Sequence, residues 1–287
     1  MREPSQLDEL RGLLVGGGRR SNVVSGNHVM ETAAIHFRLR ARVDPDRALN
    51  ALQHYLAALW QNGQILGSPT PIARARAGYS VFANLPAMDS LNRRHANRHV
   101  RRALRALAGA GFKAPKVQRL GADPEGIPAC RCRRRPFLIL FTTFFHEDSP
   151  VRCGACFQPI PLYVFPATGY GGDHYDILRW MSTYQAVDWL WIGSGAGEQF
   201  GHDQMARHDS PLSKDGRDVA KTLARVSRRP VFYRLTKALA RSYRQERARK
   251  CPSCGGRWLL DQPLHRLFDF KCDRCWLLSN IAWDVRR

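Results

Sequence analysis

Four cysteines near the end of the chain stand in two pairs with the spacing of a metal-binding turn. Cys251-Pro-Ser-Cys254 and Cys272-Asp-Arg-Cys275 each place two residues between the thiols, and seventeen residues separate the pairs. Two such turns can bind one ion tetrahedrally, and four thiolates favour zinc, with iron as the competitor. The pattern predicts a zinc ribbon. Its zinc should be structural and not catalytic, because four protein ligands leave no position for water.

The residues between the two pairs also fit a ribbon. The strand-like segments WLL and RLFDFK can pair as a hairpin, and the metal would replace the core that a module of about 40 residues lacks. The aromatic side chains of this module could fill its thin core or stack on bases. These aromatic residues are Trp258, Phe268, Phe270, Trp276 and Trp283.

The other four cysteines form a second candidate cluster, in which Cys130-x-Cys132 and Cys153-x2-Cys156 are separated by twenty residues. The second pair has the spacing of a good metal-binding turn. The first is less usual, because a single intervening residue strains chelation by both thiols. We expect a second zinc bound by four sulfur atoms, with ordinary buried thiols as the alternative.

Few residues suggest catalysis. No HExxH motif occurs, and the glycines at 16–18 are followed by no Lys-Ser or Lys-Thr of a phosphate-binding loop. Glu198, His202 and Asp203 could form an acid/base cluster in the segment 194–203, although polar loop residues usually have no chemical role. We therefore expect no catalytic residues, and an enzyme that uses this segment is the least favoured function.

The charge of the chain is strongly unbalanced. Its 287 residues include 45 lysines and arginines against 24 aspartates and glutamates, which gives a formal net charge of +21. The physical reason for such an excess is an acidic partner, most commonly DNA or RNA, although a basic surface that binds nothing is the plainer alternative. A protein-interaction module of the adaptor or immunity type, stabilised by structural zinc, is the second function class.

One predicted helix concentrates positive charge on a single side. In the segment 89–108, with Asp89 or Ser90 as the N-cap, five arginines fall within one 100° sector, and no acidic residue follows Asp89. This face could bind phosphates or simply be solvated. A second basic segment, from Arg241 to Lys250, precedes the ribbon. The candidate nucleic-acid-binding residues are Arg94, Arg98, Arg101, Arg102, Arg105, Arg241 and Arg244.

The expected location is the cytoplasm, where paired thiols bind metal more often than they form disulfides. No apolar run approaches the length of a membrane span, and the N-terminus lacks the pattern of a signal peptide. Residues 1–29 are rich in glycine, serine and arginine without a sustained period, so we expect a flexible extension.

The order of elements predicts an α+β protein. Residues 30–122 read as β-α-β-α-β, with strands AIHFRLRARV, GYSVFANLP and APKVQRLG. A ferredoxin-like or similar α+β domain is expected, with a parallel α/β arrangement as the alternative. Residues 123–245 form a central mixed α/β region with the first cysteine cluster. Residues 246–287 form the C-terminal zinc ribbon. In the central region we expect PLYVFP to be a strand and 194–216 to be a loop.

Several motifs of the chain resemble a family of uncharacterised bacterial proteins, described as containing a zinc ribbon and as candidates for nucleic-acid binding. The likeness runs from about residue 33 to 284. It implies a zinc ribbon at Cys251, Cys254, Cys272 and Cys275, and nucleic acid as a partner. The motifs that carry it are RCGACFQPIPLY, SGAGEQ, RRPVFYRL, CPSCGGRWLL and FDFKCDRCWLLSNIAW.

Overall fold

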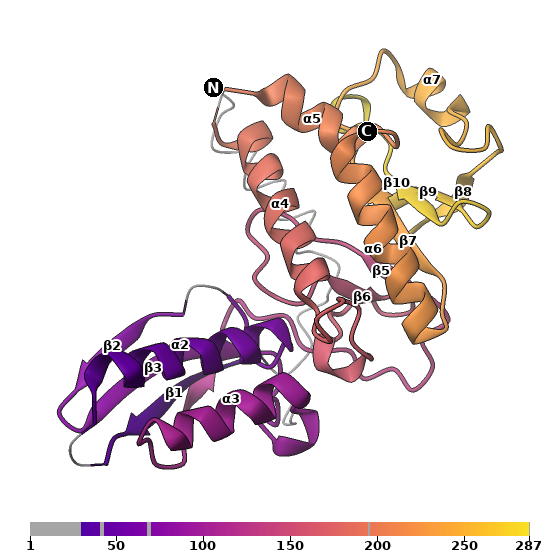
Figure 1. Cartoon of the computed structure of the whole chain (residues 1–287). Helices are drawn as coiled ribbons and strands as arrows, with labels where there is room; N and C mark the ends of the chain where they lie inside the picture. Colours follow the sequence, from indigo (N-terminus) through magenta and orange to yellow (C-terminus); the bar gives the residue numbers. More distant parts are fainter. Residues whose placement is uncertain (1–29, 41–42, 68–69, 195, 287) are drawn as a thin grey trace.

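The computed structural model describes residues 30–40, 43–67, 70–194 and 196–286 (Figure 1). The predicted extension over residues 1–29 lies outside these ranges. The described residues form two β-sheets with helices, which confirms the mixed α+β class. No helix in the described ranges has both the length and the apolar character to cross a membrane.

The N-terminal domain is a four-stranded antiparallel sheet covered by two helices. Its elements follow the order β-α-β-β-α-β, and its sheet order β2-β3-β1-β4 is that of a ferredoxin-like fold. The central strands β1 and β3 pair along their whole length, from Glu31 opposite Leu85 to Arg38 opposite Gly78. The elements are β1 (Glu31–Arg38), α2 (Pro45–Gln61), β2 (Ile72–Ala75), β3 (Gly78–Leu85), α3 (Arg98–Gly109) and β4 (Lys116–Ala122).

Two features of this domain differ from the sequence prediction. Strand β2 was not expected, because its sequence IARA has only four residues and no alternation of apolar and polar side chains. It lies at the edge of the sheet, and three of its four residues are exposed. Helix α3 begins at Arg98 and not at residue 89, because the side chain of Asn97 caps it by accepting from the backbone N–H groups of residues 99 and 100. Residues 93–95 form a separate 3-10 turn.

Helices α2 and α3 lie on the same side of this sheet (Figure 1). Alternate residues of the strands point toward the helices and form the core with Leu52 and Leu59 of α2 and Leu107 of α3. Phe37 of β1 contacts Phe112 edge to face, with ring centroids 6.2 Å apart. The apolar stripes of the two helices are therefore buried against one face of the sheet.

The rest of the chain is organised around one six-stranded sheet of order β6-β5-β7-β10-β9-β8. The hairpin β8–β9 was expected as part of a ribbon. Strand β10 then continues this hairpin into the central region by pairing in parallel with β7, from Leu277 opposite Tyr233 to Ser279 opposite Leu235. The strands are β5 (Leu138–Leu140), β6 (Val151–Cys153), β7 (Val231–Leu235), β8 (Leu259–Leu264), β9 (Phe268–Cys272) and β10 (Leu277–Ser279).

Helices α4 (Tyr175–Ile192), α5 (Glu198–Ala206) and α6 (Pro211–Ser227) complete this part of the fold (Figure 1). Trp180 of α4 and Tyr233 of β7 are fully buried between helices and sheet, with ring centroids 6.0 Å apart. Gly216 of α6 lies against both rings. A Cβ at this position would lie 2.2 Å from the Tyr233 ring and 2.5 Å from Trp180 Nε1.

Two further predictions in the central region were wrong. Residues 162–164 of PLYVFP form a 3-10 turn, because the prolines on both sides disfavour a paired strand. Helix α5 occupies part of the predicted loop, where Gly197 precedes it in a left-handed conformation with φ of 77°. Met205 of α5 is fully buried, so tertiary packing stabilises a helix whose sequence is rich in glycine and polar residues.

The two sheets are connected by side-chain and backbone contacts. Trp60 of α2 meets Tyr175 of α4 edge to face, and the backbone N–H of His174 donates to the carbonyl of Gln61 at 3.0 Å. Near the start of α3, the His95 ring lies 4.3 Å from the Tyr163 ring. Helix α3 therefore contacts the rest of the chain near its N-terminal end, packs on the sheet through Val100 and Leu107, and exposes its opposite face.

We expect Gly216→Ala to destabilise the protein by about 1–3 kcal/mol, because an added methyl must displace two buried aromatic rings. The matched control is Gly109→Ala at the end of α3, where a Cβ would have nothing within 4 Å. This control should leave stability unchanged or raise it by up to about 1 kcal/mol. Chemical denaturation of both variants tests the packing, and equal stabilities would contradict it.

Candidate metal centres

The C-terminal cysteines converge on one point between the end of α7 (Tyr243–Ala248) and the strands β9 and β10. Cys272 is the last residue of β9, and Cys275 lies just before β10. The four Sγ atoms of this cluster lie within 4.8 Å of one another, and the Sγ atoms of Cys254 and Cys272 are 3.7 Å apart. The predicted convergence of Cys251, Cys254, Cys272 and Cys275 is therefore present.

Backbone conformation explains why both turns can present two thiols inward. The residue after each second cysteine adopts a positive φ, 69° at Gly255 and 52° at Trp276. This reverses the chain, so that the backbone N–H of Gly255 donates to the carbonyl of Cys251 at 2.8 Å. Glycine adopts this conformation without strain, whereas tryptophan adopts it at a cost. Partial burial of Trp276 and the β9–β10 pairing hold the second turn in place.

The first cluster has one turn of the same kind. Cys153 ends strand β6, and Phe157, directly after Cys156, has a φ of 62° and donates to the carbonyl of Cys153 at 2.8 Å. The Cys-x-Cys segment instead curls onto itself, with the backbone N–H of Cys132 3.4 Å from Cys130 Sγ. The four Sγ atoms again lie within 4.8 Å of one another.

The sulfur spacing fits a tetrahedral metal site. With zinc–sulfur bonds of about 2.3 Å, neighbouring sulfur atoms of a tetrahedron are separated by about 3.8 Å. The closest pairs measured here are 3.6 Å between Cys130 and Cys156 and 3.7 Å between Cys254 and Cys272. A disulfide requires about 2.05 Å, and all eight cysteines are free. The two groups of four cysteines could each hold a metal ion in a structural site.

The thiols of each group compete for protons. Burial raises the pKa of the Cys272 thiol to about 12, whereas the backbone N–H of Gly256 lowers that of Cys254 to about 7. In the first cluster a hydrogen bond from Cys156 lowers the pKa of Cys130 to about 4, and the same contact raises that of Cys156. Each cluster therefore favours a mixture of thiols and thiolates, and a bound cation would favour four thiolates.

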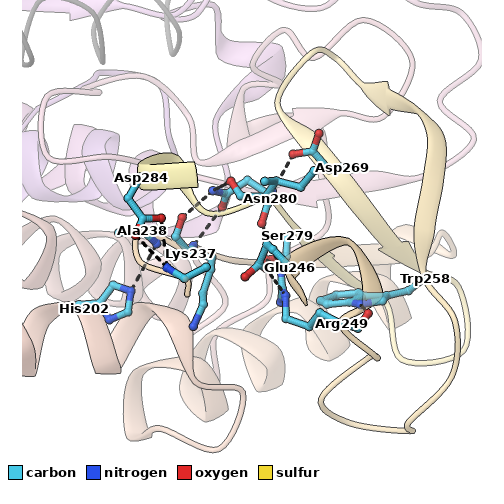
Figure 2. A network of polar contacts seen from close by, with 12 residues as sticks. His202, Lys237, Ala238, Glu246, Arg249, Trp258, Asp269, Ser279, Asn280 and Asp284 are labelled. Carbon is cyan, nitrogen blue, oxygen red and sulfur yellow. Dashed lines mark hydrogen bonds and ion pairs between the residues drawn. The ribbon is translucent and has the colours of Figure 1, made fainter. Parts of the chain in front are cut away.

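A network of polar contacts joins the C-terminal cluster to the central sheet (Figure 2). Arg249, two residues before Cys251, forms an ion pair with buried Glu246 and donates to the carbonyl of Asn280 at 3.0 Å. Its guanidinium lies 4.9 Å from the ring of Trp258, whose indole N–H donates back to the Arg249 carbonyl at 2.9 Å. The network thereby fixes the chain that leads into the first turn.

The same network continues through Asn280 to Lys237, and Asp269 also belongs to it (Figure 2). The side-chain amide of Asn280 donates to the carbonyl of Lys237 at 2.6 Å and accepts from its backbone N–H at 3.0 Å. Asp269 accepts from the N–H of Ile281 at 2.7 Å. Sequence reasoning missed these residues, and the one available signal was the polar pair Ser-Asn inside the apolar run WLLSNIAW.

The aromatic residues of the C-terminal segment mostly fill the core. Trp258, Phe268 and Phe270 are buried, and Trp283 stacks on Trp191 of α4 with ring centroids 5.2 Å apart. Among these candidates for base stacking, Trp276 is the most exposed, at 37%. The stacking hypothesis is therefore restricted to one side chain of this segment.

The candidate arginines fall into three groups. Arg94 lies outside α3, in the 3-10 turn, where it pairs with Asp89, so its predicted place on the helix was wrong. Arg98 donates to the carbonyl of Gly171 at 3.0 Å, and this hydrogen bond joins the N-terminal domain to the central region. The third group is exposed on α3, in the first turn of α7, or just before the N-cap of α7. It comprises Arg101, Arg102, Arg105, Arg241 and Arg244.

The candidate acid/base residues Glu198, His202 and Asp203 belong to neither cysteine cluster. His202 is buried, and its Nε2 accepts from the backbone N–H of Ala238 at 3.3 Å, which gives the ring a structural contact (Figure 2). Glu198 is exposed at the start of α5, and Asp203 lies 3.7 Å from His202 Nδ1. Catalysis by this segment stays a hypothesis.

Comparison with known proteins gives a relative of nearly the same extent. A protein of Haemophilus influenzae described as "Uncharacterized protein" is 31% identical over 254 residues, which cover 87% of this chain and 97% of that protein. The chain belongs to the same family. A second Haemophilus influenzae protein with the same description is 35% identical over 146 residues, which are 51% of this chain and 71% of that one.

Three family models, each described as a domain of unknown function, also match this chain. DUF8589 matches residues 30–121, DUF2310 matches 132–236 and DUF8594 matches 240–285. The two groups of four cysteines, each of which could hold a metal ion, agree with the resemblance seen in the sequence, whereas its zinc-ribbon and nucleic-acid parts stay predictions. A Caulobacter crescentus structure described as a candidate antibiotic biosynthesis monooxygenase has 17% identity and a TM-score of 0.26. It covers 33% of this chain and 93% of its own, and a likeness at this level carries no argument.

We expect two metal ions per chain in native mass spectrometry of the purified protein. Cys254→Ser and Cys156→Ser should each remove one ion, and Cys254→Ser should destabilise the fold by several kcal/mol because metal binding and folding are coupled. Ser253→Ala, an exposed position in the same turn, is the control and should keep both ions. A folded protein without metal would refute the assignment of the two centres.

Proposed function

We propose that this protein binds nucleic acid through a basic surface, and that its two metal centres hold structural zinc. The observation that carries the proposal is the exposed arginine face of α3. Arg101, Arg102 and Arg105 are exposed, and none of them has an ion pair with any residue that the structure describes. Their charge is therefore available to an external anion such as a phosphate.

The distribution of charge along the chain supports this location. Between residues 31 and 120 the sequence has fifteen lysines and arginines but only four aspartates and glutamates. One of these acids, Glu31, is already paired with Arg119 and buried, and another, Asp89, is paired with Arg94. The ferredoxin-like domain therefore has a positive surface that its own acidic side chains do not neutralise.

Zinc is the metal that the donor sets favour. Four thiolates at tetrahedral spacing suit zinc or iron, and both centres are closed by protein ligands, so neither offers a site for water or substrate. Eight reduced cysteines used as ligands also support a reducing compartment, and we propose the cytoplasm. In this proposal the zinc ions stabilise the fold and take no part in chemistry.

We predict that replacing Arg101, Arg102 and Arg105 together with Gln will weaken binding to all nucleic-acid sequences alike. Arginines that neutralise phosphates act without reading bases, so the slope of log affinity against log salt should fall by about 2–3. Arg98 stays unchanged in this variant because it contacts Gly171. Fluorescence anisotropy with labelled duplex and single-stranded oligonucleotides, between low and physiological salt, measures both quantities.

The matched control is Lys214, Lys221 and Arg225 replaced together with Gln on helix α6. These side chains are exposed, and the change in net charge is the same. The control differs in the position of the charge and in one exposed ion pair, between Lys221 and Asp218, which is worth little to stability. The control should keep most of the parental affinity. If both triple variants lose affinity equally, net charge and not the α3 face drives binding. If the parent binds no oligonucleotide at low salt, the proposed function fails.

A protein partner is the second candidate function. Trp189 of α4 and Phe200 of α5 are exposed aromatic side chains on two helices that contact each other. Exposed aromatic residues are enriched in protein interfaces, whose affinity depends weakly on salt. A partner retained at high salt by the parent and lost from Trp189→Ala would favour this candidate.

A further inference from the structure

The ferredoxin-like sheet has a second face that its helices leave uncovered. Residues of β1 at positions 33, 35 and 37 point toward α2 and α3, so positions 32, 34, 36 and 38 point to the opposite side. The register places Ser80, Phe82 and Asn84 of β3 on this same side, opposite His36, Ala34 and Thr32. We call this side the open face.

The open face presents an aromatic ring at its centre. Phe82 lies on β3, one of the two central strands, and is 50% exposed. Its partner across β1 is Ala34, a residue too small to cover the ring. The ring therefore stands above a flat surface and can accept another planar group.

Hydrogen bonds keep the surroundings of Phe82 flat and ordered. The ring nitrogens of His36 lie 2.9 Å from Ser80 Oγ and 3.3 Å from Gln118 Oε1, so His36 spans three adjacent strands. On the neighbouring pair, the hydroxyl of Thr32 donates to Asn84 Oδ1 at 3.0 Å. These side chains offer polar edges beside the exposed ring.

The charge of the open face is entirely positive among the residues described. Lys116 lies opposite His36 in the register of β4 with β1, and Arg38 follows on the same side of β1. Both side chains are exposed. In the strands β1 to β4 no aspartate or glutamate occupies an outward position, since their one acidic residue, Glu31, has the parity of the core positions and is paired with Arg119.

We propose that the open face binds single-stranded nucleic acid, with a base stacked on Phe82 and the backbone phosphates near Lys116 and Arg38. Aromatic rings on a four-stranded sheet stack with unpaired bases, and the polar edges of neighbouring side chains can contact those bases. The inference rests on the proposed function and adds a second surface to it, because the open face lies on the side of the sheet away from α3 and would contact the bases of an unpaired strand.

Charge favours this occupant over a second copy of the chain. Two open faces in contact would bring Lys116 and Arg38 of both copies together, without acidic residues between them to compensate. A duplex is also excluded from the ring, because its bases are stacked internally and a flat sheet contacts only its backbone. An unpaired strand supplies both negative charge and exposed bases.

The test compares Phe82→Ala with Phe200→Ala. Phe200 is a phenylalanine of similar exposure, 56%, on helix α5, so the two variants remove the same side chain from different surfaces. With labelled single-stranded DNA and RNA of mixed sequence, Phe82→Ala should bind about 5- to 100-fold more weakly, whereas Phe200→Ala should bind as the parent does. Phe82→Tyr, which keeps the ring, should restore most of the affinity.

Two further measurements sharpen the result. Lys116→Gln should lower the salt slope for single strands by about 0.7, the amount expected for one phosphate. Duplex binding should be nearly the same in the parent and Phe82→Ala. A comparison of the affinities for single-stranded DNA and single-stranded RNA shows which of the two the open face binds more tightly. Thermal melting should be unchanged in all four variants, because the substituted side chains are exposed.

The failures are distinguishable. Parental affinity for single strands in Phe82→Ala would overturn this inference and leave the proposed function intact. Absence of any oligonucleotide binding by the parent at low salt would overturn both. If sedimentation shows a parental dimer that Phe82→Ala converts to a monomer without loss of nucleic-acid affinity, a second copy covers the open face and the inference is wrong.

Discussion

Four negatively charged sulfur atoms can share a few ångströms of space only when a cation offsets their repulsion. Both cysteine groups place their sulfur atoms within 4.8 Å, and each group includes the last residue of a strand in the same six-stranded sheet, Cys153 of β6 and Cys272 of β9. A metal ion at each site would therefore fix the ends of strands in both halves of that sheet. Strand β6 has only three residues, so a fixed Cys153 at its end would help to hold its pairing with β5.

Metal ions bound at the two cysteine groups would also change the net charge of the chain. A divalent ion with four thiolates carries a net charge of −2, so two such centres would lower the formal charge of the chain from +21 to about +17. Some basic residues near the centres have structural roles, and Arg249, enclosed by Glu246, Trp258 and Phe270, is the clearest example. On the ferredoxin-like domain, by contrast, Arg101, Arg102 and Arg105 have no ion pair among the described residues, and this distinction directs attention to that domain.

The sequence predicted what depends on local spacing. Cysteine spacing identified both sulfur clusters, and apolar periodicity identified α2, α4 and most strands of the ferredoxin-like sheet. The start of α3 was missed because Asp89, Ser90 and Asn97 are all good caps. Only the fold reveals that Asp89 pairs with Arg94 and that Ser90 contacts the backbone of Ala87. The open face could not be recognised from Phe82 alone, because an alternating strand gives no sign of which face remains uncovered.

The parallel pairing of β10 with β7 has a consequence for the synthesis of the chain. Leu277 follows Leu235 by 42 residues, so at ordinary translation rates the ribosome adds β10 roughly 2–8 s after β7. During this interval β7 has a neighbour on one side only, and its other edge can pair with a foreign strand. The yield of native protein should thus depend on how fast the final segment is translated relative to encounters between neighbouring chains.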